Sequence, residues 1–362
     1  MQIAEIEILL KKAIGLDSES VGTAAIERAV QQRLTATGIR NPADYLEKVQ
    51  SSATELQELI EGVVVSETWF FRDPEAFAVV AENVLQQWLP KRGEGDLLRI
   101  LSIPCATGEE PYTIAMALDG VGLPTDEYHI DAVDVSEHAL ARARKAIYGR
   151  NSFRGRNLEF RDVYFDAHPH GYQLKERIRR RVLFQRENLF GPDFFPGSNL
   201  FHFIFCRNLL IYFDQEAQAR AIRTLKRLLT PDGLLFVGPA EAALLLNHEM
   251  ASIKRPLAFG FRKCASAPRN IPSVAKQVVR KQKPSLTALP PKAPSPKFHA
   301  KSQRVSLSHP PANSPGRTAA DLSRVRELAD KGQLAEAAKL CQRWIEDNPP
   351  SAEAFHLLGV IH

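Results

Sequence analysis

Acidic side chains follow two of the apolar segments that the sequence predicts to be strands. Residues 97–104 lead into CATGEEP, where Gly108 precedes two glutamates, and residues 128–134 end at Asp134. Ligands of doubly wound sheets bind at the carboxyl ends of the strands, so we expect both groups at one site. The glycine pattern G-x-G-x-x-G is absent, and the two glutamates stand where a pyrophosphate would sit. Carboxylates there disfavour a dinucleotide and favour a ligand with a cationic end, such as an amino acid.

The spacing of these groups adds a second ligand feature. Asp134 stands 26 residues after Gly108, close to the offset of an acid that hydrogen-bonds ribose hydroxyls. A ribose together with an aminoacyl cation describes S-adenosyl-L-methionine, which we therefore expect as the cofactor. Taken singly, these acids could be a loop glutamate and a helix-capping aspartate. Their order on consecutive strands favours the cofactor interpretation.

A second candidate group is SETWFFRDP, which begins at Ser66. Its three consecutive aromatic residues follow neither the alternation of a half-exposed strand nor the spacing of a helical stripe, and they precede Arg72 directly. The residues alone leave two interpretations open. Arg72 belongs to the ligand site, or it pairs with Asp73 or a glutamate at the surface, where an ion pair contributes little.

The elements that must position these residues alternate between about residue 76 and Lys263. Apolar runs predict strands, and amphipathic stretches between them predict helices; the strands are 97–104, 128–136, 182–188, 201–208 and 234–238, and the helices are 109–118, 137–147 and 215–229. This alternation predicts an α/β fold with a parallel, doubly wound sheet. Residues 155–181 lack a helical period, and we expect a small antiparallel β-subdomain there.

Four parts are expected along the chain. Residues 1–75 form an N-terminal helical domain, with Asn41 as an N-cap and Pro42 at the first helical position. Residues 76–264 form the sheet domain. Residues 265–320 hold ten prolines, ten Lys or Arg and no acid, which is typical of a disordered tether.

Residues 321–362 match the tetratricopeptide (TPR) pattern. Gly332, Ala337 and Pro349 fall at the turn glycine, the small packing residue and the terminal proline of one repeat, and Phe355, Leu358 and Gly359 open the next. A stable array needs about three repeats, so we expect the sequence to be cut inside a longer array.

Composition limits the class of protein. The net charge of +5 comes from the linker, so we expect no nucleic-acid partner. No apolar run approaches a membrane span and no signal peptide is evident, so we expect no direct membrane insertion. The four cysteines are far apart and form no CxxC, which favours a cytoplasmic protein with reduced thiols; we assign no metal ligands.

Several of these motifs are those of a known family. TWFFRD, CATGEEPYTIAM, DVSEHALARARKAIYG, FIFCRNLLIYFD and LTPDGLLFVG closely resemble the CheR-type methyltransferases of bacterial chemosensory pathways. The attached repeats resemble the branch found in Wsp-type surface-sensing systems that act in biofilm formation. The resemblance implies an all-α domain, a Rossmann-like S-adenosylmethionine domain and a small β-subdomain. The implied reaction forms γ-glutamyl methyl esters on the cytoplasmic helical domain of a methyl-accepting receptor.

Carried over position by position, the resemblance implies a role for each site residue. The cofactor-binding residues are Ser66, Thr68, Arg72, Glu109, Asp134, Asn188, Leu189, Cys206 and Arg207. Glu109 is expected to meet the methionine part, Asp134 the ribose, and Asn188 with Leu189 the adenine. Ser66 falls where the best-known members have Asn, so one contact there is lost or rerouted.

The resemblance also favours a place in the site for Arg72. With Tyr212 it would orient either the substrate carboxylate or the cofactor's own carboxylate, and these two catalytic candidates are not ranked. We interpret the aromatic run as filling the junction between the helical domain and the sheet. A glutamate is already charged at neutral pH, so no general base is needed.

Two alternatives to the receptor methyltransferase stay open. One is a catalytically silent adaptor that acts through its repeats, and the other is a small-molecule methyltransferase. The repeats could also bind a further protein.

Substrate delivery is a separate hypothesis. Lys175 to Arg181 holds five basic residues and one acid, and we expect a charged strand edge there, which resists strand addition. The enzyme would then need no receptor tail peptide, because the basic insertion, the helical domain and the repeats deliver the receptor. A solvated strand face is the alternative.

Overall fold

The computed structural model of the protein describes residues 2–155, 158–264 and 333–347, together with Leu322, Arg324, Val325 and Leu328. Of the sequence predictions, the linker 265–320 and the repeat positions Gly332, Pro349, Phe355, Leu358 and Gly359 lie outside these residues.

The N-terminal part is all helical. It consists of α1 (Gln2–Ile14), α2 (Ser18–Val21), α3 (Thr23–Thr37), α4 (Pro42–Ser51) and α5 (Ala53–Val63). The predicted cap is confirmed, because Asn41 Oδ1 accepts a hydrogen bond from the Ala43 N–H at 3.1 Å and Pro42 opens α4. The apolar faces of the helices enclose their own core around Ile6, Leu10 and Leu59.

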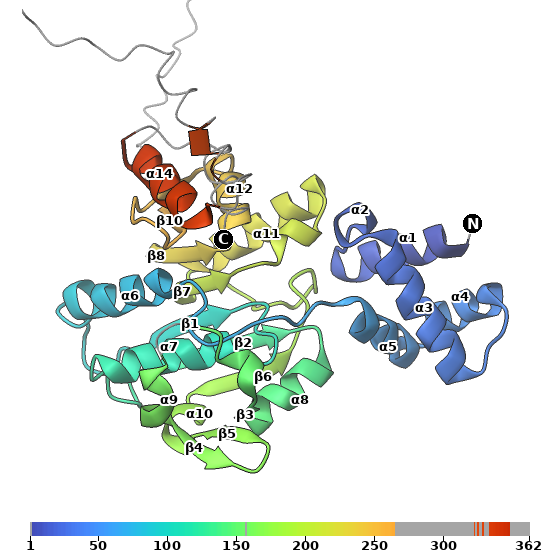
Figure 1. Ribbon diagram of the computed structural model, residues 1–362, viewed down its shortest axis with the longest axis horizontal. Coiled ribbons are helices and arrows are strands. Elements are labelled where there is room, and N and C mark those ends of the chain that lie inside the picture. The colour runs from blue at the N-terminus through green and yellow to red at the C-terminus, as the bar shows by residue number, and fades with distance from the viewer. Residues whose placement is uncertain are drawn as a thin grey trace, which may run out of the picture. The chain divides into compact units, whose positions relative to one another are not determined.

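The central domain contains a seven-stranded sheet in the order β6-β2-β1-β7-β8-β10-β9 (Figure 1). Its strands are β1 (Leu98–Ser102), β2 (Tyr128–Asp134), β6 (Val182–Arg186), β7 (Phe201–Cys206), β8 (Leu229–Val237), β9 (Met250–Ser252) and β10 (Gly260–Lys263). The first five in spatial order pair in parallel, as predicted. β10 pairs antiparallel with both β8 and β9, which the sequence analysis did not foresee.

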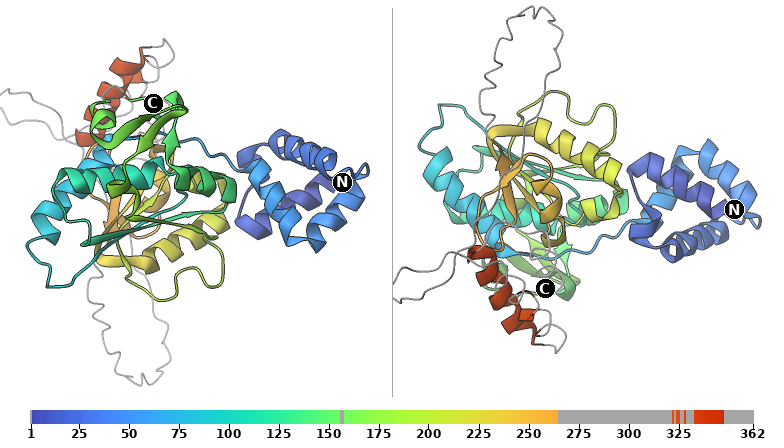
Figure 2. Two further views of the ribbon diagram at one scale, coloured as in Figure 1. Left: turned by 90° about the horizontal axis from the view of Figure 1, so that it is seen from below. Right: turned by 90° about the horizontal axis from the view of Figure 1, so that it is seen from above.

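Helices cover both faces of this sheet (Figure 2). Their bounds are α6 (Pro74–Asn83), α7 (Glu109–Gly120), α8 (Glu137–Lys145), α11 (Gln215–Leu228) and α12 (Ala242–Leu246). α11 and α12 bury apolar residues in one core with Leu101 and Ile204, whereas α6 and α7 share a second core with Ile100 and Phe203. These strand residues alternate between the two cores, as the pleat of a strand requires. The predicted doubly wound α/β fold is confirmed.

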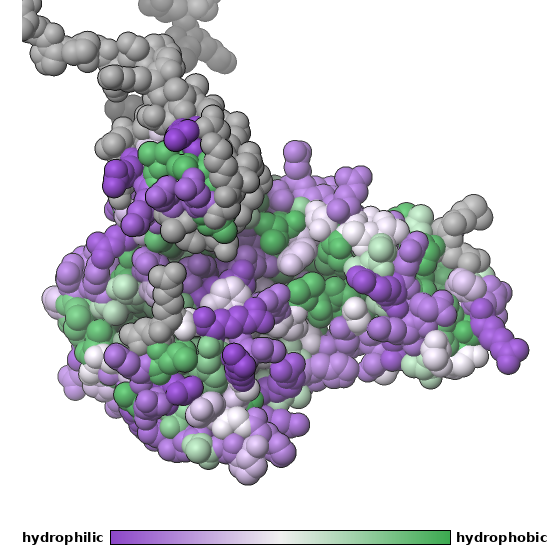
Figure 3. All heavy atoms as spheres, viewed as in Figure 1, coloured by the Kyte–Doolittle hydropathy of each residue, from purple (hydrophilic) through white to green (hydrophobic). Residues whose placement is uncertain are grey.

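A small antiparallel sheet is inserted after α8, in the order β3-β5-β4. Its elements are β3 (Ile147–Tyr148), α9 (Glu159–Tyr164), β4 (Phe165–His168), β5 (Gly171–Leu174) and α10 (Glu176–Arg179). Hydrophilic side chains cover much of its visible face in Figure 3.

The predicted charged strand edge within this insertion was wrong. The basic stretch from Lys175 to Arg181 contains α10, and its side chains are used within the domain: Arg177 pairs with Asp119 at 2.6 Å, and Lys175 donates to the Val163 carbonyl at 2.7 Å. The sheet edges within the described residues are β3 and β4. The basic stretch therefore does not shield an edge of the small sheet from strand addition.

The aromatic run at 69–71 joins different parts from those expected. Phe70 is 1% exposed, and its ring lies 4.8 Å from Tyr148 and 5.0 Å from Phe165 of the small β-subdomain, centroid to centroid. Phe71 packs on Phe160 and belongs to the same core, not to that of the helical domain. The rings therefore anchor the segment after α5 to the small β-subdomain.

The C-terminal described segment is α14 (Leu334–Asp347). Ala337, Cys341 and Trp344 are buried and recur at the three- and four-residue spacing of one helix face. Within the described residues, no helix is both long and apolar enough to cross a membrane.

Candidate active site

Two adjoining clefts open at the carboxyl ends of the parallel strands. The first has an empty volume of about 750 Å³, open solvent at its mouth included, and is walled by the helical domain on one side and by the ends of β1, β2, β6 and β7 on the other. It contains the predicted site residues Ser66, Asp134, Asn188, Leu189 and Tyr212.

The second cleft has an empty volume of about 450 Å³, open solvent included, and contains the predicted residues Thr68, Arg72 and Arg207. Both clefts share the lining residues Val65, Pro104 and Asn208, so they form one continuous site.

Asp134 is a buried carboxylate that lines the first cleft. Its Oδ2 accepts a hydrogen bond from the Ala106 N–H at 2.8 Å, and its Oδ1 accepts one from the Ser136 N–H at 2.9 Å. Burial raises the pKa of this carboxyl, and the two N–H groups act in the opposite direction. Each oxygen keeps further acceptor capacity, so the carboxylate is fixed in place and still able to bind hydroxyl groups.

The turn before α7 separates the two glutamates. Gly108 has φ +93°, and a Cβ at this position would lie 2.8 Å from the Ala143 Cβ, so only glycine fits. Glu109 is 2% exposed, accepts hydrogen bonds from Thr107 Oγ1 at 2.6 Å and Ser152 Oγ at 2.7 Å, and lines neither cleft. Glu110 lines the second cleft instead. The sequence analysis did not single out Glu110, and the contact of Glu109 with a ligand stays a prediction.

Arg207 is held by two carboxylates. Its guanidinium pairs with Glu110 at 3.1 Å and closely with Asp73. Cys206, the residue before it, is fully buried in the core beneath the sheet and lines neither cleft. Alternation along β7 explains the difference, because adjacent side chains point to opposite sides of a strand.

Arg72 lines the same cleft as Arg207, but its contacts are different. Its guanidinium stacks 4.4 Å from the Trp69 ring centroid and makes one weak hydrogen bond, to the Glu67 carbonyl at 3.4 Å. Asp73 pairs with Arg207, so the surface pair between Arg72 and Asp73 is not formed. Burial lowers the pKa of Arg72, and the like charge of Arg207 lowers it further. Arg72 is thus a partly buried cation with no ion-pair partner within the described residues.

Tyr212 lies on the first cleft, in the turn Leu210–Tyr212 after β7. Burial raises the pKa of its hydroxyl, and the positive charge of Arg72 opposes that shift. Its carbonyl accepts a hydrogen bond from the Asp17 N–H of the helical domain at 2.9 Å. This hydrogen bond ties the turn after β7 to the helical domain across the cleft.

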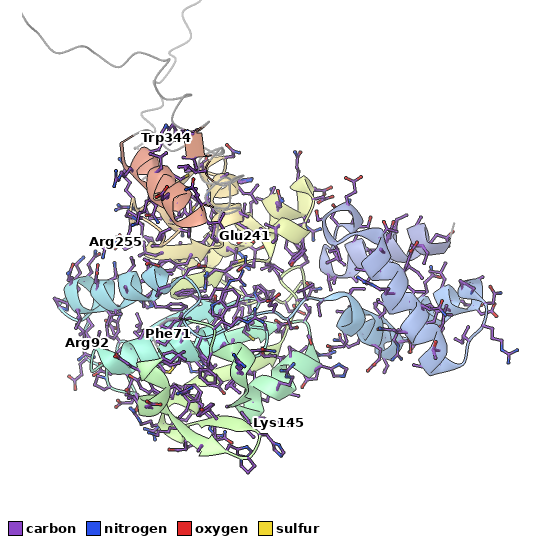
Figure 4. The ribbon with its side chains drawn as sticks, viewed as in Figure 1. Phe71, Arg92, Lys145, Glu241, Arg255 and Trp344 are labelled. Atoms are coloured by element: carbon purple, nitrogen blue, oxygen red, sulfur yellow. The ribbon has the colours of Figure 1, made fainter. Side chains whose placement is uncertain are left out.

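Glu241 supports this turn from below, and the sequence analysis missed it. Its carboxylate is fully buried and accepts four backbone N–H bonds, from Gly238 at 2.6 Å, Asn208 at 2.9 Å, and Leu209 and Leu210 at 2.7 Å each. Figure 4 marks Glu241 in the middle of the domain. The only indication in the sequence was a glutamate three residues after Gly238, the glycine that follows β8.

The helical domain is joined to the cleft by hydrogen bonds. Glu61 Oε1 accepts the Glu137 N–H at 2.7 Å at the start of α8, and its other oxygen accepts a short hydrogen bond from Ser136. Gln57 donates to the Val135 carbonyl at 2.8 Å, and Asn188 donates to the Ala13 carbonyl at 2.6 Å. The wall that the helical domain contributes is therefore fixed directly beside Asp134.

Comparison with known proteins identifies the class. The model described as "CheR methyltransferase, SAM binding domain" matches residues 66–258, and "CheR methyltransferase, all-alpha domain" matches residues 1–63. The chain belongs to the CheR methyltransferase family, and it is an S-adenosylmethionine-dependent methyltransferase.

Several curated relatives support this assignment. The chain is 46% identical over 361 residues to "Probable biofilm formation methyltransferase WspC" of Pseudomonas aeruginosa, which covers 98% of this chain and 85% of the relative. It is 40% identical to the protein of the same name from Pseudomonas putida, with 97% and 84% covered. It is 33% identical over 218 residues to "Chemotaxis protein methyltransferase" of Escherichia coli, with 58% and 73% covered.

The residues present fit S-adenosylmethionine. The first cleft offers apolar walls and a fixed carboxylate able to accept from ribose hydroxyls. The second offers Arg72, a cation that forms no ion pair within the described residues and suits a carboxylate.

Proposed function

We propose that this methyltransferase converts glutamate side chains of a methyl-accepting receptor into γ-glutamyl methyl esters, in a chemosensory or surface-sensing pathway. The names of the relatives support the pathway, because they refer to chemotaxis and to biofilm formation. The observation that carries the chemistry is Arg72, a partly buried guanidinium that lines the charged cleft and makes no ion pair within the described part of the chain. A carboxylate substrate is the anion that such a group would orient.

We assign the cofactor to both clefts. Asp134 binds the ribose, Asn188 and Leu189 line the adenine end, and Ser66 and Thr68 lie on the strand-like segment between the clefts. Arg207 contributes positive charge on the methionine side. Cys206 acts through its position in the core, and Glu109 acts through the turn before α7.

Arg72 and Tyr212 are the proposed catalytic residues. The bound S-adenosylmethionine supplies an electrophilic methyl group on a sulfonium. Arg72 orients the attacking carboxylate in line with it, and Tyr212 donates a hydrogen bond on the cleft side. Positioning supplies most of the acceleration, because the nucleophile is ionised without a base.

The organisation of the chain follows from this assignment. Residues 1–75 and 76–264 form the enzyme, with a small β-subdomain that begins at β3, earlier than the predicted bounds of 155–181. Residues 265–320 are a tether, and 321–362 begin a repeat array that binds a further protein. The enzyme acts in the cytoplasm, where the helical domain of the receptor is located.

The test is transfer of a radiolabelled methyl group from S-adenosylmethionine to fragments of candidate receptors. We expect label that is released by mild base, as methyl esters are. Cofactor binding without transfer to any protein would favour a silent adaptor. Label that appears only in low-molecular-weight products would favour a small-molecule methyltransferase.

A further inference from the structure

An exposed ion pair joins the second cleft to the segment after β3: Glu67 lines the cleft, and Arg154 lies just outside it. Arg154 pairs closely with Glu67, and its guanidinium lies 5.4 Å from the Trp69 ring centroid. Arg72 lies 4.4 Å from the same ring. Glu67, Trp69 and Arg72 all line the cleft, so one indole ring holds two guanidinium groups at its entrance.

The backbone presents Arg154 rigidly to this entrance. Two residues earlier, the Ser152 carbonyl accepts the Phe70 N–H at 2.9 Å, and Ser152 Oγ donates to buried Glu109 at 2.7 Å. Phe153 stacks on the buried ring of Phe70 with centroids 5.3 Å apart. The segment before Arg154 is thus anchored to the segment that carries Arg72.

The ion pair between Arg154 and Glu67 is weaker than the contacts that anchor the backbone before Arg154. The side chains of Arg154 and Glu67 are 44% and 58% exposed, and exposed ion pairs contribute little because water screens both charges. The negative charge of Glu67 also acts on its neighbours. Burial lowers the pKa of Arg72, and Glu67 opposes that change; burial raises the pKa of Tyr212, and Glu67 adds to it. A carboxylate already lies near the two catalytic candidates, where a substrate carboxylate must arrive.

We propose that Arg154 and Glu67 form an exchangeable ion pair, in which an acidic side chain of the substrate replaces Glu67 as the partner of Arg154. The inference rests on the proposed function, because it requires an acidic protein substrate. Residues three or four apart on a helix lie side by side, about 5–6 Å between their Cβ atoms. A helix with two acids at that spacing would offer one to Arg72 for methylation and the other to Arg154. Arg154 is then a specificity-determining residue for glutamates that have an acidic neighbour.

The test uses the full chain and a receptor fragment that the wild type methylates, at saturating S-adenosylmethionine. We expect Arg154→Ala to raise the KM for the fragment about three- to tenfold, as loss of a charge contact at an interface rim does, with kcat within about twofold. The affinity for S-adenosylhomocysteine should not change, because Arg154 lines neither cleft.

Arg92→Ala is a matched control. Arg92 also lies 5.4 Å from a tryptophan ring, that of Trp88, and pairs closely with Glu127. It lies before β1, away from the carboxyl ends of the strands, and Figure 4 shows it well apart from Glu241. We expect Arg92→Ala to have the same KM for the receptor fragment as the wild type.

Two further variants test the exchange itself. Glu67→Gln removes the competing carboxylate and should lower the KM about two- to fivefold. A fragment in which the acid three or four residues from the methylated glutamate is changed to Gln should lose affinity for the wild type but not for Arg154→Ala.

The outcomes separate the two levels of inference. An active wild type with equal KM values for Arg154→Ala and Arg92→Ala would overturn the exchange, and so would a raised KM for Glu67→Gln. A wild type that methylates no glutamate in any receptor fragment would overturn the proposed function, and the exchange with it.

Discussion

The two clefts differ in how their polar groups are used. In the first cleft the walls are largely apolar, and Asp134 is already bonded to two main-chain N–H groups. In the second cleft charged side chains face one another: Arg207 pairs with two carboxylates, whereas Arg72 forms no ion pair among the residues that the structure describes. The first is suited to holding a ligand by shape and fixed acceptors, and the second to orienting an anion. Substitutions in the two clefts should therefore change different measured quantities.

The largest effect is expected where one residue serves both clefts. Glu241→Gln keeps the shape but places an NH₂ group against backbone N–H donors, so about two of the four bonds are lost. We expect the free energy of unfolding to fall by about 2–4 kcal/mol, with weaker S-adenosylhomocysteine binding and slower transfer. Urea unfolding and ligand titration measure these changes.

Glu249→Gln is the control, because Glu249 is exposed and pairs with Lys226 at the surface. Equal unfolding free energies for the two variants would show that the buried carboxylate does not hold the turn after β7.

Arg72→Ala tests the charged cleft alone. Removing a charged hydrogen bond of roughly 1.5–3 kcal/mol should slow methyl transfer about 10- to 150-fold. Unfolding should not change, because the side chain makes no ion pair within the described residues. Single-turnover rates at saturating cofactor measure the effect. Unchanged transfer would return Arg72 to the role of a surface residue.

Asp134→Asn tests the first cleft. The amide keeps one acceptor oxygen, and its NH₂ group must face either the Ala106 or the Ser136 N–H. We expect the dissociation constant of S-adenosylhomocysteine to rise about tenfold, and kcat at saturating cofactor to change less. A variant that loses kcat but binds normally would reverse the division between the clefts.

The smallest effect is expected on removing the C-terminal part. None of its described residues lines either cleft. A fragment ending near Lys263 should bind S-adenosylhomocysteine within about twofold of the full chain, by calorimetric titration. If binding needs the repeat segment, the division into an enzyme and a separate array is wrong.

The sequence predicted those features that depend on local pattern. Continuous apolar runs indicated the five parallel strands, and their order indicated where Asp134 would lie. The place of Arg72 in the site was implied only by the family resemblance. Partners set by tertiary packing were not predictable. No local pattern in the sequence indicated that Glu110, and not Glu109, lines the cleft. Nor did any pattern indicate that Asp73 forms an ion pair with Arg207.

Two errors share one physical cause. The aromatic run was assigned to the junction between the helical domain and the sheet, and Lys175 to Arg181 to a strand edge. Both depended on which element lies next to the segment in space. Short segments with mixed side chains carry little periodicity, so their neighbours decide their structure.

The bonds from Glu61 and Gln57 to the start of α8 also bear on kinetics. They fix the helical domain as one wall of the first cleft, and Tyr212 holds the same domain from the other side through Asp17. Movement of the helical domain away from the sheet would break these bonds. Where such movement accompanies release of the spent cofactor, its rate sets the dwell time of that cofactor and can limit turnover even when the chemical step is fast.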